Sequence, residues 1–200
     1  MYKRREVIYF RGDPSETLYF IKAGSVKLTY LDKSGRRLTL LILKEGQPFG
    51  VLALTGEETR QQVAEALTDV TLCIIRKADL LRFLQSYPQS SLRVIELISR
   101  QMQEIEQKLE DLLFKPLPDR LAALLGKLAQ QFGEPFGGGQ RIGLKLTHQE
   151  LADLIGSTRE STTLEFSRFR KLGLIGRCRE GYIIILNDEK LKAVASSSGL

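Results

Sequence analysis

The chain of 200 residues is 42% hydrophobic and 27% charged, and it carries a formal net charge of +6. No apolar run is long enough to span a membrane and no signal-peptide core follows the N-terminus, so we expect a cytoplasmic protein without a membrane partner. Two cysteines and one histidine are too few for an iron–sulfur cluster or for most His-based metal and catalytic sites. We therefore expect no enzyme, no metal site, no haem and no iron–sulfur cluster.

Residues 7–75 contain short apolar runs with a period near two, separated by glycines. This pattern predicts short strands in an antiparallel sandwich or roll. Residues 49–54 (FGVLAL) lack the alternation, and Arg60 follows shortly after them. We expect a short helix or turn there beside a ligand pocket, with backbone N–H groups that can hold an anion. A plain loop is the alternative.

Residues 90–113 are expected to form one long helix. Its apolar residues recur at alternating steps of three and four, the spacing of a coiled-coil seam, at Ile95, Ile98, Met102, Ile105, Leu109 and Leu112. We interpret the seam as a parallel dimer interface, with packing on the chain's own sandwich as the alternative. Pro116 and Pro118 cannot continue a helix, so residues 114–118 are expected to be a hinge.

Residues 146–175 read as two short helices around a tight turn. Thr147 and Glu150 have the spacing of a capping box, and Gly156 stands where a helix ends in a left-handed residue. Ser157 and Glu160 have the same capping-box spacing and open a second helix to about residue 172. This arrangement predicts a helix-turn-helix, with a plain helical hairpin as the alternative.

The second helix begins with side chains suited to base edges, since Arg binds guanine, Glu accepts from cytosine, and Ser or Thr serves either. Basic residues at its far end are suited to phosphates. Residues 114–200 also hold 13 Lys and Arg against 9 Asp and Glu, an excess of four out of the net six. The residues expected to contact DNA are Thr147, His148, Ser157, Thr158, Arg159, Glu160, Ser161, Thr163, Leu164, Arg168 and Lys171.

The rest of the second half is expected to support this motif. Residues 119–132 have the apolar spacing of an amphipathic helix, and the glycine-rich residues 133–140 are expected to be a flexible loop before a short strand at 142–146. Residues 175–179 and 182–186 flank Glu180-Gly181 and predict a two-residue hairpin, which we interpret as a wing. The Ser-rich end after Ala195 is expected to be disordered.

A roll, a heptad helix, a hinge and a winged helix-turn-helix, in that order, resemble the Crp/Fnr family of transcriptional regulators. The likeness is most specific in FRGDPSETLYFIKAGSVKLTY and LTHQELADLIGSTRES. It implies an α+β fold with an N-terminal antiparallel β-roll, cyclic-nucleotide-binding-like and of the cupin-type jelly-roll form. The expected division is an effector-binding roll at 1–89, a dimerisation helix at 90–113, the hinge at 114–118 and a DNA-binding domain at 119–200.

The resemblance also implies partners. Family members are homodimers in which an effector in the roll reorients the second domain, so we expect a palindromic operator in double-stranded DNA and, as a further partner, RNA polymerase. Leu164 stands where members usually carry a second arginine. We expect it to contact a thymine methyl and the operator to be a relaxed one.

The effector is inferred from a narrower resemblance. The phosphate cassette of the cyclic-nucleotide binders is missing, because Val51 follows Gly50, so cyclic AMP is disfavoured. The FGVL stretch is instead similar to the 2-oxoglutarate-responsive nitrogen regulators, and two arginines suit a dicarboxylate. Their effector residues would correspond to Phe49, Gly50, Val51, Leu52, Arg60 and Arg100. Ile105 occupies the place of their helix glutamate, and an effector-independent regulator or another ligand stays open.

Together these features predict a homodimeric, sequence-specific transcription regulator, interpreted as an activator, with 2-oxoglutarate as the candidate effector. The alternative is a ligand-sensing module that regulates a partner protein without specific DNA binding. A nucleophile–base pair, a metal cluster and a phosphate-binding Walker loop are all missing from the sequence, which disfavours an enzyme.

Overall fold

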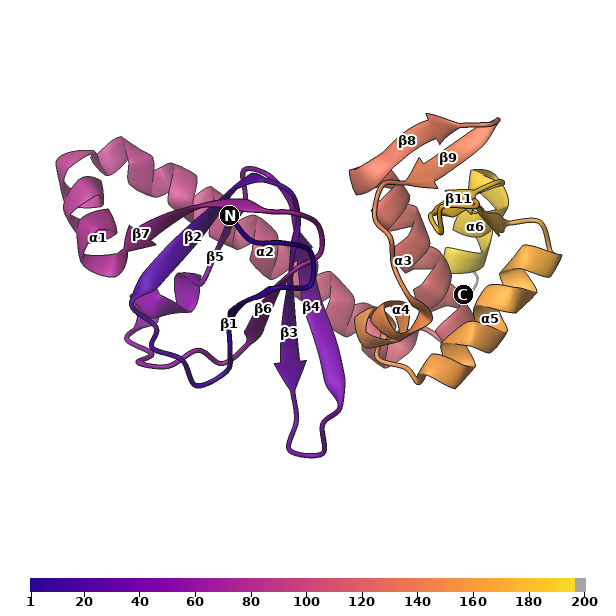
Figure 1. Cartoon of the computed structure of the whole chain (residues 1–200), viewed down its shortest axis with the longest axis horizontal. Coiled ribbons are helices and arrows are strands. Elements are labelled where there is room, and N and C mark those ends of the chain that lie inside the picture. Colours follow the sequence, from indigo (N-terminus) through magenta and orange to yellow (C-terminus); the bar gives the residue numbers. More distant parts are fainter. Residues whose placement is uncertain (197–200) are drawn as a thin grey trace. The chain divides into compact units, whose positions relative to one another are not determined.

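The computed structural model describes residues 1–196, and the chain divides into two compact units, Met1–Lys108 and Leu109–Leu200 (Figure 1). None of the described helices combines the length and apolarity that a membrane crossing requires. The expected disorder after Ala195 falls mainly on residues 197–200, which lie outside the described residues.

The first unit is a roll of two antiparallel sheets. One has the order β1-β6-β3-β4 and the other β5-β2-β7. Buried residues of both sheets form a common core, so the roll is closed by apolar burial between them. The strands are β1 (Val7–Tyr9), β2 (Thr17–Ala23), β3 (Val26–Leu31), β4 (Arg37–Leu43), β5 (Pro48–Phe49), β6 (Val63–Ala66) and β7 (Thr71–Arg76).

Of residues 49–54, Phe49 ends β5, Gly50 is the N-cap and the rest lie in a short 3₁₀ helix, η1 (Val51–Thr55), as expected beside the pocket. Two helices follow the roll, α1 (Lys77–Ser86) and α2 (Pro88–Phe114), and α2 is the long helix expected at 90–113. The antiparallel roll and the long helix are thus confirmed.

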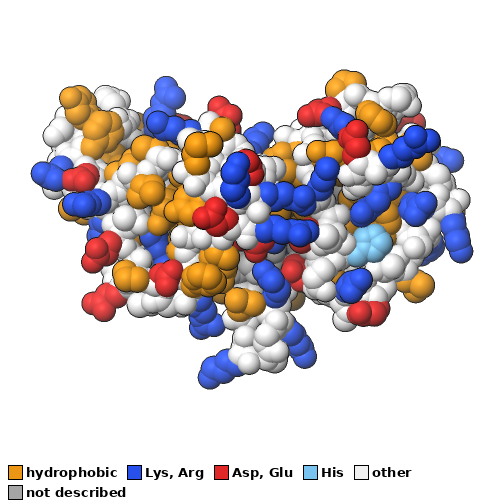
Figure 2. Space-filling model, in the orientation of Figure 1, with side chains coloured by type: hydrophobic (Ala, Val, Ile, Leu, Met, Phe, Trp, Pro, Cys, Tyr) orange, Lys and Arg blue, Asp and Glu red, His pale blue; other side chains and the backbone are white. Residues whose placement is uncertain are grey.

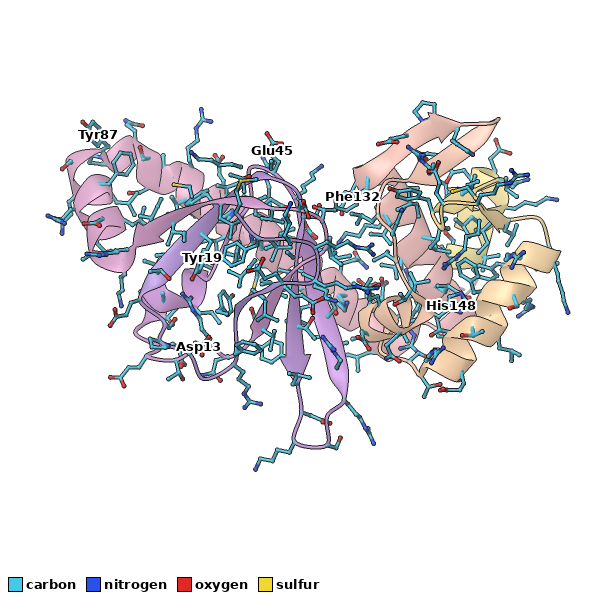
Figure 3. The ribbon with its side chains drawn as sticks, in the orientation of Figure 1. Asp13, Tyr19, Glu45, Tyr87, Phe132 and His148 are labelled. Carbon is cyan, nitrogen blue, oxygen red and sulfur yellow. The ribbon has the colours of Figure 1, made fainter. Side chains whose placement is uncertain are left out.

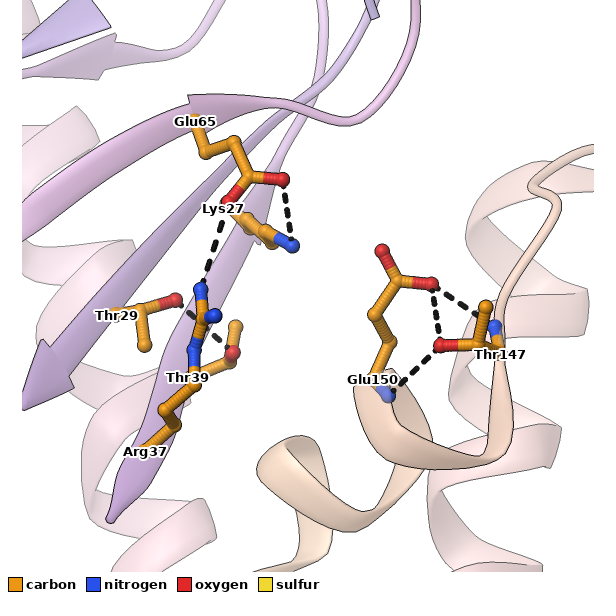
Figure 4. A network of polar contacts seen from close by, with 7 residues as sticks. All are labelled: Lys27, Thr29, Arg37, Thr39, Glu65, Thr147 and Glu150. Atoms are coloured by element: carbon orange, nitrogen blue, oxygen red, sulfur yellow. Dashed lines mark hydrogen bonds and ion pairs between the residues drawn. The ribbon is translucent and has the colours of Figure 1, made fainter. Parts of the chain in front are cut away.

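A mostly buried polar network ties three strands of the first sheet together (Figure 4). Lys27 on β3 forms an ion pair of 2.9 Å with Glu65 on β6, and Arg37 on β4 lies 3.5 Å from the same carboxylate. Thr29 and Thr39 share a hydrogen bond of 3.0 Å between β3 and β4. Because a buried charge is costly without a partner, this pairing favours one strand register.

The second unit packs helices on one another beside a small sheet. Helix α3 (Leu117–Phe132) contacts α4 (His148–Ile155), α5 (Arg159–Lys171) and α6 (Asp188–Ala195). The sheet has the order β10-β11-β9-β8. Its strands are β8 (Gly133–Phe136), β9 (Gly139–Ile142), β10 (Ile175–Arg177) and β11 (Ile183–Ile185).

The loop and the strand expected at residues 133–146 are both wrong. Residues 133–140 are no flexible loop, because β8 and β9 pair as a hairpin whose turn, Gly137-Gly138, has two positive φ angles, 52° and 81°. Such angles suit a two-residue hairpin turn, which glycine adopts without strain. The strand expected at 142–146 therefore ends at Ile142.

The wing and the expected hinge also differ in detail. The N–H of Cys178 donates to the carbonyl of Tyr182 at 3.0 Å, so the hairpin loop has three residues and not two, with Gly181 at a φ of 90°. Helix α3 begins at Leu117, two residues earlier than expected, since proline is tolerated in the first turn of a helix. Lys115 and Pro116 alone separate α2 from α3.

Candidate nucleic-acid interface and effector cavity

The first helix of the motif begins as its sequence predicts. The Thr147 hydroxyl accepts from the N–H of Glu150 at 3.1 Å, and the Glu150 carboxylate accepts from the N–H of Thr147 at 2.8 Å (Figure 4). Gly156 ends α4 with a φ of 61°. These contacts satisfy backbone groups at both ends of an eight-residue helix and confirm the capping box.

The second helix is capped by a different residue from the one expected. Thr158, and not Ser157, accepts from the N–H of Ser161, at 3.1 Å. Because α5 begins at Arg159, Thr158 is its N-cap, and Ser157 belongs to the end of α4, where its N–H donates to the carbonyl of Ala152 at 3.0 Å. In the turn between the helices, Ser157 therefore completes the end of α4, and Thr158 caps the start of α5.

Helix α5 divides into a buried and an exposed face. Thr162, Phe166 and Phe169 are buried against the rest of the unit. The opposite face exposes Arg159, Glu160, Ser161, Leu164, Arg168 and Lys171. Leu164 is 75% exposed and so presents an apolar side chain on this otherwise polar face.

The exposed face contains a shallow hollow. It is lined by Arg159, Glu160, Thr163, Leu164 and Ser167, so four of the residues expected to contact DNA meet there. The Arg159 guanidinium makes no hydrogen bond or ion pair to any described side chain, whereas Arg168 lies 3.0 Å from Glu165. Ser167 was not expected; its place one turn after Thr163 on the same face is the signal that identifies it.

His148 connects the two helices (Figure 3). Its Nδ1 lies 2.8 Å from the Thr163 hydroxyl, which donates to the carbonyl of Arg159 at 2.7 Å, so the imidazole N–H is the donor to Thr163. Burial lowers the pKa of His148 below 6.5, and the nearby Arg177, Arg159 and Arg170 lower it further. A neutral His148 thus positions the start of α5.

Strands β9 and β10 and the loop after β9 add basic residues that were not among those expected. Arg141 and Lys145 both lie 4.9 Å from the ring centre of Tyr182. Arg177 stacks at 5.3 Å over the ring of Phe166 and donates to the carbonyl of Leu146 at 3.2 Å. Figure 2 shows Lys and Arg side chains gathered around the single histidine of the second unit. This surface suits a polyanion.

The roll encloses a cavity of about 310 Å³ between the sheets, η1 and α2. Five of the six expected effector residues line it, namely Phe49, Gly50, Val51, Leu52 and Arg60. The sixth, Arg100, is exposed and does not line it; the lining residues of α2 are Ile98, Gln101, Met102 and Ile105. Gln101 is a polar residue beside the apolar stripe of α2, and this position in the sequence could have identified it as a residue of the cavity.

Arg60 is the cation of this cavity and is only 5% exposed. Its guanidinium donates to the carbonyls of Gly50 and Thr17, at 3.2 and 2.5 Å, and to the Thr17 hydroxyl at 3.0 Å. It stacks 4.5 Å over the ring of Tyr9 and 5.6 Å from that of Tyr19. Among the described residues no carboxylate forms an ion pair with it, so its charge is available to an anion.

The apolar residues of α2 that were expected to form one seam lie in two different surroundings. Ile98 and Ile105 are partly buried and line the cavity, as the alternative packing on the roll required. Ile95, Met102 and Leu109 are 58%, 58% and 56% exposed. Leu112 is half-buried, and Leu92 and Leu113 extend the exposed stripe at 61% and 67%.

Comparison with known proteins agrees with this architecture. Residues 1–87 match the cyclic nucleotide-binding domain, and residues 119–194 match the Crp-like helix-turn-helix domain. The global nitrogen regulator of Synechocystis sp. is 35% identical over 192 residues, which cover 95% of this chain and 81% of that protein.

The chain belongs to the Crp/Fnr family.

Other family members are also similar over nearly the whole chain. A Crp/Fnr-family transcriptional regulator of Thermus thermophilus is 31% identical, with a TM-score of 0.81, over 99% of this chain and 98% of that one. A CRP-like cAMP-activated global transcriptional regulator of Mycobacterium tuberculosis is 29% identical over 94% of this chain and 84% of that protein. The chain is thus a DNA-binding transcriptional regulator of the Crp/Fnr type, and its relatives are regulators and not enzymes.

Proposed function

We propose that this Crp/Fnr regulator acts as a homodimer that binds a palindromic operator through the exposed face of α5. The observation that supports this most is the Arg159 guanidinium, unpaired among the described side chains, beside Glu160 and Leu164 in one hollow. Arg159 would bind a guanine edge, Glu160 a cytosine amine and Leu164 a thymine methyl. Arg168 and Lys171, exposed at the end of α5, would contact phosphates.

The exposed stripe on α2 is the proposed dimer seam. Its apolar residues Ile95, Met102 and Leu109 are spaced seven apart, which keeps them on one side of a supercoiled helix. A twofold axis along this seam would present two copies of α5 to half-sites about one helical turn apart. In this arrangement residues 1–89 would sense the effector, and the hinge around Lys115 would link it to the DNA-binding domain.

The roll cavity is the proposed effector site. A buried arginine without a carboxylate partner among the described residues favours a small organic anion, which would explain why the cavity carries a charge at all. The resemblance to the nitrogen regulators makes 2-oxoglutarate the first anion to test in this cavity. Cyclic AMP is disfavoured by Val51 after Gly50. RNA polymerase is the proposed downstream partner, with activation as the outcome.

The test is a titration of the full chain against a palindromic duplex selected from random DNA. Tight, salt-dependent and sequence-selective binding is expected, because each phosphate contact releases counterions. The titration is repeated with 2-oxoglutarate and with cyclic AMP. Binding that ignores sequence would contradict the proposal and favour a sensing module that regulates a partner protein.

The dimer is tested separately by light scattering. Ile95→Glu with Leu109→Glu should give monomers, since two carboxylates would face their copies in the seam. Gln103→Glu, at an exposed position outside the seam, is the control and should remain dimeric. A dimeric double variant would place the interface elsewhere.

A further inference from the structure

Three buried polar side chains around the roll cavity have unused hydrogen-bonding capacity. Arg60, Tyr9 and Gln101 are 5%, 6% and 6% exposed, and all three line the cavity. None of the free polar atoms of these three side chains is among the fully buried, unpartnered atoms of the described residues, so these atoms are accessible from the cavity. Their unfilled positions therefore describe the ligand that would complete them.

Arg60 and Tyr9 provide donors at one end. A guanidinium has five N–H donors, and Arg60 uses three of them on Gly50 and Thr17. Two remain, and the Tyr9 ring that the guanidinium stacks over carries a hydroxyl with no partner among residues 1–196. Burial raises the pKa of Tyr9, so the phenol keeps its proton. This end suits one carboxylate or a similar anion.

Gln101 provides an acceptor on α2. Its Nε2 donates to the carbonyl of Pro48 at 2.6 Å. A carbonyl accepts only from the NH₂ side of an amide, so this bond fixes the orientation of the side chain. The Oε1 atom has no donor in the described part of the chain. It would accept from a hydroxyl or N–H of the ligand and would repel a second carboxylate.

The wall of the cavity is mainly apolar. Leu28, Leu40, Leu41, Ile98, Met102 and Ile105 form much of it. Of the described residues that line it, Arg60 is the only Lys or Arg, and Arg100, the other arginine expected there, is exposed. A second carboxylate in this cavity would have no cation to pair with among the described lining residues, which also include Ser15, Tyr30, Thr59, Gln61 and Gln62. A dicarboxylate should therefore bind less tightly than a matched ligand with a neutral end.

We infer that the effector is a small monoanion with an apolar body and one uncharged hydrogen-bond donor. The anion binds Arg60 and Tyr9, and the donor binds Oε1 of Gln101. This inference rests on the proposed role of the cavity as the effector site, and it disfavours dicarboxylates. Because Gln101 lies on α2 together with Ile98, Met102 and Ile105 of the apolar wall, the donor and the apolar body of the ligand both contact the proposed dimer helix.

The test is calorimetric titration of the full chain with a matched series, hexanoate, 6-hydroxyhexanoate and hexanedioate, together with 2-oxoglutarate. The hydroxy acid should bind roughly three- to tenfold more tightly than hexanoate, the range of one neutral hydrogen bond. It should bind at least about tenfold more tightly than hexanedioate, whose second carboxylate lacks a partner.

Two variants assign the preference to residues. Gln101→Leu should abolish the advantage of the hydroxyl over the methyl end, whereas Gln103→Leu, exposed on the same helix, should retain it. Tyr9→Phe should weaken all four probes by a similar factor, because it removes a donor at the shared carboxylate end. Circular dichroism confirms that each variant is folded.

Tightest binding of hexanedioate or 2-oxoglutarate would overturn the inference, as would a Gln101→Leu variant that keeps the hydroxyl preference. Absence of binding by all four probes at millimolar concentration would also overturn it. None of these results touches the operator titration, so the monoanion inference can fail while the proposed DNA-binding function stands.

Discussion

Arg159 and Arg60 are central to the two sites, and their surroundings differ in every respect. Arg159 is exposed on α5 and donates to no described side chain, so its guanidinium is open to solvent. Arg60 is buried and gives three donors to Gly50 and Thr17. An exposed arginine adapts to a large partner, whereas a buried one is held in place before a small ligand arrives. The first site should tolerate substitution structurally, and the second should not.

The largest loss of stability should come from a substitution at Gly50, whose backbone conformation and close contacts leave no room for a side chain. A Cβ there would lie 2.8 Å from Nη1 of Arg60, and φ is 74°. Gly50→Ala should lower the free energy of unfolding by about 2–4 kcal/mol, from strain and overpacking together, in a urea titration. Gly56→Ala is the control, since its φ is 92° but nothing lies within 4 Å of its Cβ. Equal losses would remove the clash with Arg60 from the explanation.

Arg159→Ala should have the next largest effect, and on DNA binding alone. Loss of a guanine contact should weaken the selected operator by about 1–3 kcal/mol and relax its sequence at one position. The urea midpoint should not change, because the side chain forms no hydrogen bond or ion pair within the described part of the unit. Arg168→Ala is the matched control and should weaken all sequences alike. If Arg159→Ala lowered the urea midpoint, Arg159 would contribute to stability, and the proposed difference from Arg60 would be wrong.

Loss of the N-cap of α5 should have a smaller effect on stability, and it tests whether Thr158 or Ser157 caps this helix. Thr158→Ala removes the acceptor for the N–H of Ser161 and should lower the free energy of unfolding by about 1 kcal/mol. Ser157→Ala should change it by less than about 0.5 kcal/mol, because Ser157 contributes its backbone N–H. The reverse order, in thermal or urea unfolding, would restore Ser157 as the cap.

The smallest effect should be a pH dependence at His148. Its pKa is lower in the folded chain than its ordinary value of 6.5, so the unfolded chain binds a proton more readily. This contribution to stability is complete above pH 6.5 and is lost as the pH falls below it through the folded pKa. His148→Gln should flatten that part of the urea midpoint against pH. An unchanged profile would assign the loss to other groups.

The helix-turn-helix was predictable from the sequence because its signals are local. Thr147, Glu150 and Gly156 act within one or two turns of each other, so their spacing alone predicts α4. The cap of α5 was mistaken because Ser157 and Thr158 both have suitable side chains, and the end of the preceding helix decides between them. The hairpin at 133–142 was missed because four of its residues are glycines, which resemble a loop in composition.

The roll cavity was predictable only in part, because its residues come from distant segments. The FGVL stretch and Arg60 are close in sequence and were found together. Tyr9 and Gln101 stand 92 positions apart, and only the folded chain brings both to the cavity. On α2 a difference of one position, between Arg100 and Gln101, turns a side chain from solvent to the cavity, since successive residues are rotated by about 100°.

Helix α2 also constrains how this protein can change. Met102 lines the cavity and is 58% exposed, so its side chain belongs both to the cavity wall and to the proposed dimer seam. A substitution that enlarges the cavity at this position alters the assembly surface in the same step. Directed evolution towards a new ligand should therefore recover paired changes, one at Met102 and a compensating one at Ile95 or Leu109. Screens that select for ligand response alone would discard such pairs.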